Sequence, residues 1–83
     1  MTEAEIGVIG CALIDNDSMY KVYNKLKPEM FSTEFCQDAF AEMLAMYDRG
    51  ESINIISLSQ ALENHKWDPE MIAADLKECV TVA

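Results

Sequence analysis

The chain has 83 residues, of which 51% are hydrophobic and 25% are charged, a composition that excludes disorder and is typical of one ordinary globular domain. A chain of this length buries only about 60–65% of the surface that its unfolded form exposes, which limits it to one modest core. Six lysines and arginines against fifteen acidic residues give a net charge of −9, which disfavours binding to nucleic acid or to an anionic membrane.

The first predicted helix spans about residues 3–14. Thr2 and Glu5 have the spacing of a capping box, in which each side chain satisfies a free backbone amide of the other. Polar residues are so few here that we expect protein to surround this helix almost completely. Gly7 and Gly10 each lower helix stability by about 1 kcal/mol relative to alanine, which indicates that another backbone packs closely there. The expected buried face consists of Ile6, Ile9, Gly10 and Leu13, widened by Val8, Cys11 and Ala12.

A polar cluster at residues 15–18 predicts a turn followed by a short helix over about 18–26. Pro28 should end that helix, because it biases Lys27 away from helical dihedral angles. The inward side chains are expected to be Met19, Val22, Tyr23 and Leu26, and Met30 with Phe31 is expected to form an apolar plug in the connector.

The longest predicted helix spans about residues 33–49 and ends before Gly50, which occupies the C′ position. Glu34, Asp38 and Glu42 form an acidic stripe on the side opposite its apolar residues. Di-metal sites in helical bundles require Glu-x-x-His motifs, so a solvated acidic face is favoured over a carboxylate metal cluster. The expected buried set is Cys36, Ala39, Phe40, Met43, Leu44 and Tyr47.

Two more helices complete the prediction. Asn54 caps one over about residues 55–65, and residues 68–69 begin the last with an aspartate cap and a proline at the first helical position. Residues 53–56 would also suit a strand, but a lone strand without a partner is unstable. We therefore predict an all-α fold over residues 1–83, a compact orthogonal bundle of about five short helices. The inward residues are Ile55, Leu58, Ala61 and Leu62, then Ile72, Leu76, Cys79 and Val80.

No motif for catalysis, cofactor binding or metal binding is present in the sequence, so we predict no catalytic, cofactor or metal site. A P-loop and a dinucleotide fingerprint are both missing. His65 is expected to be an exposed residue near a helix C-terminus rather than a catalytic base. The segment 15–17 resembles part of a calcium loop but lacks the required glycine and glutamate. Cys11, Cys36 and Cys79 are expected to be reduced, buried thiols rather than a disulfide or zinc set.

Candidate docking residues are also few, and the partner-binding face is left unassigned. Among the six methionines, Met46 and Met71 have no obvious place, whereas Met30 and Met43 suit the core. Trp67 precedes a helix cap, where a hydrophobic staple is favoured over a partner hot spot. The acidic stripe of Glu34, Asp38 and Glu42 is one hypothesis for steering a basic partner, such that charge reversal there would slow association.

The sequence also bears on localisation. The apolar run at residues 6–14 is too short to cross a bilayer. Glu3 and Glu5 lie where a signal peptide would be basic, so a secretory signal is not expected. We therefore expect a cytoplasmic protein with no membrane contact.

Several segments in order resemble the N-terminal domain of DnaB-type replicative DNA helicases. Residues 3–15, EAEIGVIGCALID, are similar to the family's E-A-E-x-x-V-L-G-x-L-L-x-D opening. Residues 30–31, 40–43 and 53–62 are similar to its D-F, I-F-x-x-M and V-D-L-I-T-L-x-x-x-L elements, and residues 72–76 lie where the family has an A-x-Y-L-like helix. The resemblance covers nearly the whole chain. Two departures are Asp68-Pro69-Glu70 in place of a G-G pair and Asn54 in place of aspartate.

The resemblance implies an N-terminal helical head that docks primase and other replication proteins and organises the hexameric helicase ring. It implies that a helical hairpin, a linker and a RecA-like ATPase domain, which would bind ATP and magnesium, follow beyond residue 83. We therefore expect no ATPase or unwinding site and no nucleic-acid binding in this head, and a monomer or weak dimer in solution.

The alternative hypothesis is a stand-alone helical adaptor or inhibitor that mimics the helicase head and competes for its partners. The two hypotheses differ in whether the gene continues past Ala83 into a P-loop or stops there.

Overall fold

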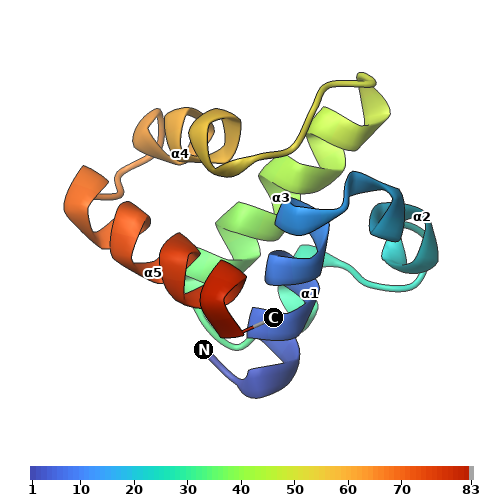
Figure 1. Ribbon diagram of the computed structural model, residues 1–83, viewed down its shortest axis with the longest axis horizontal. Helices are drawn as coiled ribbons and strands as arrows, with labels where there is room; N and C mark the ends of the chain where they lie inside the picture. The colour runs from blue at the N-terminus through green and yellow to red at the C-terminus, as the bar shows by residue number, and fades with distance from the viewer. Residues whose placement is uncertain (83) are drawn as a thin grey trace.

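The computed structural model describes residues 1–82, and every regular element within them is helical (Figure 1). The all-α prediction is confirmed, and the strand alternative for residues 53–56 is wrong: the described residues contain no strand. The elements in chain order are α1 (Glu3–Ile14), η1 (Asn16–Ser18), α2 (Met19–Val22), η2 (Pro28–Met30), α3 (Glu34–Asp48), α4 (Ile55–Glu63) and α5 (Pro69–Val82), where η marks a short 3-10 helix.

The helix starts follow the capping residues predicted from the sequence. The Thr2 hydroxyl accepts a hydrogen bond of 3.2 Å from the Glu5 amide, and the Glu5 carboxylate accepts one of 2.9 Å from the Thr2 amide. Asn54 caps α4 through the Ser57 amide at 2.9 Å. The Asp68 carboxylate accepts hydrogen bonds from the amides of residues 70 and 71, so it begins α5 despite its departure from the family pattern.

Helix α3 ends in a Schellman motif at Gly50. The Glu51 amide donates to the Met46 carbonyl at 2.8 Å, and the Gly50 amide donates to the Tyr47 carbonyl at 3.1 Å. Gly50 has a φ of +70°, a left-handed conformation that costs little only for glycine. This confirms the predicted helix end.

Helix α2 is shorter than predicted, because its regular hydrogen bonding does not extend beyond the first turn. Residues 23–25 form turns that bond back to Met19 and Val22. Lys27 has extended angles, φ −126° and ψ 150°, as expected for a residue before proline. Pro28 instead begins η2, and the chain changes direction before α3.

One core lies between the helices. Helix α1 packs on α5, α5 packs on α4, and α4 and η2 pack on α3. Figure 1 shows α5 and α4 on one side of α1 and α2 on the other. The fully buried large side chains include Ile9, Met19, Phe40, Met43, Ile53, Leu58, Leu62, Ile72 and Leu76.

Several side chains differ from the predicted core. Ile55, predicted to be buried, is 40% exposed, whereas Ile53 in the connector is 1% exposed. The reason is that Asn54, the capping residue of α4, turns the chain between them. Met30 is 60% exposed, so only Phe31 of the predicted plug is buried.

The turn after α1 is fastened to the connector before α4. The Asn16 amide group donates to the Ala12 and Ile53 carbonyls, at 2.8 and 2.6 Å, and its oxygen accepts from the Ile53 amide at 2.7 Å. Asp15 accepts from the Asp17 amide at 3.1 Å, which confirms the predicted turn. This acidic segment therefore has a structural role in the described chain.

No helix within residues 1–82 has both the length and the apolar character needed to span a bilayer.

Candidate partner-docking surface

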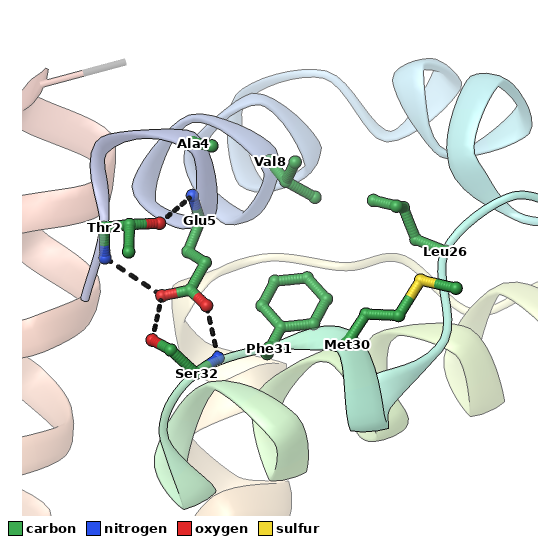
Figure 2. Close-up of a pocket in the computed structure, with 8 residues that line it drawn as sticks. All are labelled: Thr2, Ala4, Glu5, Val8, Leu26, Met30, Phe31 and Ser32. Atoms are coloured by element: carbon green, nitrogen blue, oxygen red, sulfur yellow. Dashed lines mark hydrogen bonds between the residues drawn. The ribbon is translucent and has the colours of Figure 1, made fainter.

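Glu5 anchors the start of α1 to the segment that leads into α3. Its carboxylate accepts hydrogen bonds from the Thr2 amide, the Ser32 amide and the Ser32 hydroxyl (Figure 2). The side chain is buried, yet these donors, with the Thr2 amide first and the Ser32 amide next, lower the pKa of the Glu5 carboxyl below its usual value. The sequence predicted only the bonds within the capping box, because the contact with Ser32 is tertiary.

Protein does not surround α1 as the sequence predicted. Ile6, Ile9 and Ala12 are buried, whereas Ala4 and Cys11 are exposed, because α5 covers one face and the short α2 leaves much of the other open. The exposed side remains apolar. This face of α1 is apolar and incompletely covered by the rest of the described chain.

The prediction of close backbone packing at Gly7 is also wrong within this chain. Gly7 lies inside α1, has no positive φ, and no heavy atom of the neighbouring structure lies within 4 Å of the position where its Cβ would be. Neither backbone conformation nor packing therefore requires glycine at this position. Gly10, one turn further on, is buried.

Two adjoining hollows lie over the exposed face of α1. One, of about 350 Å³, is lined by Val8, Leu26 and Met30 among others (Figure 2), and the second, of about 330 Å³, is lined by Val8, Cys11 and Val22. Ala4 and Val8 line both, so the hollows form one groove along the helix. We call this surface the α1 groove.

The acidic stripe of α3 is only in part the solvated face that the sequence predicted: Glu34 is exposed, whereas Asp38 and Glu42 are partly covered. The Trp67 indole N–H donates a 2.8 Å hydrogen bond to the Asp38 carboxylate, and Lys66 pairs with Glu34. The His65 imidazole lies 3.5 Å from the Glu42 carboxylate and is itself exposed, as predicted. The side chains of Asp38 and Glu42 are consequently only 27% and 26% exposed.

Trp67 is thus an intramolecular anchor that sequence periodicity did not reveal. Its ring lies edge-on to Phe35, with centroids 5.3 Å apart, while its N–H reaches α3. Met46 is also part of the core, at 3% exposure, whereas Met71 is exposed. The bonds and packing of Trp67 disfavour it as a hot spot for a partner.

All three cysteines are free thiols, but their environments differ. Cys36 and Cys79 are fully buried as predicted, and burial raises the pKa of Cys79 to about 11 and that of Cys36 in the same direction. Cys11 is exposed, which corrects the prediction that it is buried. Residues 1–82 contain no cluster of three or more His, Cys, Asp or Glu side chains placed to hold a metal ion.

The family model for the DnaB-like helicase N-terminal domain matches residues 1–83, the whole chain. The chain belongs to this family. The helical fold and the order of its elements are consistent with a DnaB-like N-terminal domain. No curated protein and no solved structure matches the chain. The α1 groove is an exposed apolar surface of this DnaB-like domain.

Proposed function

We propose that this DnaB-like domain is the N-terminal head of a replicative DNA helicase, which acts in DNA replication by docking primase and other replication proteins and by organising the helicase ring. The observation that carries the proposal is the family match over residues 1–83. The apolar α1 groove is consistent with a docking role, because contiguous exposed apolar surface is one mark of a site for protein contact.

The chain's charge supports protein partners rather than DNA as direct ligands. A net charge of −9 repels phosphate, and nucleic-acid binding requires a cationic face that neutralises several phosphates. In this proposal ATP and magnesium are bound by a separate domain of the full-length helicase, and the head supplies no ATPase site. Ring organisation then depends on self-association in the full-length hexamer, and we expect this chain alone to be a monomer or weak dimer.

The proposal is tested by titrating the chain with the C-terminal region of the cognate primase and measuring heat or fluorescence anisotropy. We expect saturable one-to-one binding per chain. A matched control is an unrelated acidic helical domain of similar size, which should not bind. If primase binds the chain no better than it binds the control, the primase-docking role is wrong. Sedimentation of the chain alone checks the oligomeric state, and a tight hexamer would contradict the proposed dependence on the rest of the protein.

A further inference from the structure

The α1 groove has an apolar floor along the exposed face of α1. Val8 lines both hollows, and Leu26 lies across from it in the first (Figure 2). Val22 of α2 lines the second. At one end, Met30 is 60% exposed although it is a large apolar side chain. Burial of such side chains against a partner is favourable in proportion to the apolar area removed from water.

Gly7 leaves open space over α1, because nothing lies within 4 Å of the position that its Cβ would occupy. Glycine within a helix lowers its stability relative to alanine, and nothing inside the chain compensates, since Gly7 has neither a positive φ nor a close neighbour. What glycine provides here is free space on the solvent side of α1. Such a position allows a second helix to approach more closely than a side chain would permit.

The segment 18–27 borders the groove through Lys21, Val22 and Leu26 and is basic, whereas the protein as a whole is acidic; we call this segment the lysine edge. Lys21, Lys25 and Lys27 are three of the chain's six basic residues, and residues 18–27 contain no aspartate or glutamate although the net charge is −9. All three lysines are exposed, and Lys21 lines the groove. Glu5, a carboxylate at the other end of the groove, is buried and ionised in its hydrogen bonds with Thr2 and Ser32, so the positive charge is concentrated on the α2 side of the groove.

We propose that the α1 groove docks an amphipathic helix of the partner whose apolar stripe is flanked by carboxylates. The proposal rests on the docking function proposed above and adds the surface and the chemistry of the bound segment. An apolar floor between helices suits a helix that inserts side chains at a spacing of three and four residues. The lysine edge suits carboxylates, which would set the orientation and speed association. Nucleic acid is disfavoured, because its phosphates would use the lysines but not the apolar floor.

The test compares groove variants with matched variants elsewhere, in the same titration with the C-terminal region of the cognate primase. Gly7→Gln fills the opening with a good helix former, and Ala73→Gln makes a similar change at an exposed position of α5. A triple charge reversal at residues 21, 25 and 27 removes the lysine edge, and Lys77→Glu on α5 is its control. Thermal melting of each variant establishes that it is folded.

We expect Gly7→Gln and the triple reversal each to weaken primase binding by about ten-fold or more, as for groups at the centre of an interface, while both α5 controls bind as the original chain does. The affinity of the original chain should fall with salt, and that of the triple reversal should depend on salt much less. If folded groove variants bind primase normally, the groove is not the docking site, although the docking function stands. If the original chain does not bind primase, both proposals fail. Lysine-dependent binding of a short DNA duplex in place of primase would also overturn the proposed helix.

Discussion

The indole N–H of Trp67 donates a 2.8 Å hydrogen bond to the carboxylate of Asp38, a residue 29 positions earlier in the chain. This bond fastens the turn between α4 and α5 onto the N-terminal half of α3. The bond also explains why Asp38, an acidic residue on the outer side of α3, is partly buried. The pair is therefore expected to contribute to folding stability.

Asp38→Ala should destabilise the fold by about 1–3 kcal/mol, because it leaves the Trp67 N–H partly buried without its acceptor. Asp38→Asn retains an acceptor and should cost less. Glu34→Ala is the control: it removes an exposed pair with Lys66, which solvent screens, and should cost much less than Asp38→Ala. Urea unfolding followed by fluorescence of the single tryptophan measures all three. Equal effects of Asp38→Ala and Glu34→Ala would show that the indole bond contributes little.

The carboxylate of Glu5 predicts a pH dependence. Its pKa in the fold is below the usual value of 4.5, so the ionised form contributes stability above that value, and the contribution is lost as the pH falls through the lowered pKa. Glu5→Gln should cost about 1.5–3 kcal/mol at neutral pH, because hydrogen bonds to a charged acceptor are replaced by weaker ones. The difference should disappear in acid.

Thermal unfolding of the original chain and Glu5→Gln at several pH values measures this difference. Glu3→Gln, an exposed change in the same helical turn, is the matched control and should have a much smaller effect. A Glu5→Gln penalty that persists unchanged at low pH would argue against the ionised contact with Thr2 and Ser32.

The thiols should react in two classes. Cys11 is exposed and should react rapidly with a disulfide reagent at pH 8. Cys79 has a pKa of about 11, so only about one molecule in a thousand carries its thiolate at that pH, and burial also blocks access. We expect one fast thiol in the folded chain and three after unfolding in urea. Cys11→Ser should abolish the fast phase; a fast phase that survives would place a second thiol at the surface.

Gly7 and Gly50 should respond to alanine in opposite directions. Gly7→Ala should stabilise the chain by up to about 1 kcal/mol, because α1 gains helix propensity and the new methyl meets nothing within 4 Å. Gly50→Ala should destabilise it by about 1–2 kcal/mol, because its φ of +70° is strained for other residues. Chemical denaturation compares the two variants. Destabilisation by Gly7→Ala would contradict the open space over α1.

Local signals in the sequence predicted the helices well. Capping at Thr2 and Asn54, the Gly50 stop and the effect of Pro28 on Lys27 all depend on residues close together in the chain. These features require only short-range backbone chemistry, so periodicity and caps are sufficient to locate them. The all-α class followed from them directly.

The contacts that shape the candidate site are long-range and were missed for that reason. Asn16 bonds to Ile53, and Trp67 bonds to Asp38, across 37 and 29 residues respectively. The apolar residues of α1 correctly predicted a helix, but they did not reveal that the rest of the chain covers only one face of that helix. The α1 groove could not be predicted without knowing how short α2 is and where α5 packs.

The most direct test of the account is to map the primase contact on an isotopically labelled chain by two-dimensional NMR. Unlabelled primase C-terminal region is added stepwise, and the backbone amide shifts are followed at each residue. We predict that the largest changes fall on Gly7, Val8 and Cys11 of α1 and extend to residues 21–27, with little change in α4. Saturable binding whose shifts are confined to α4 and α5, with α1 unaffected, would contradict the account.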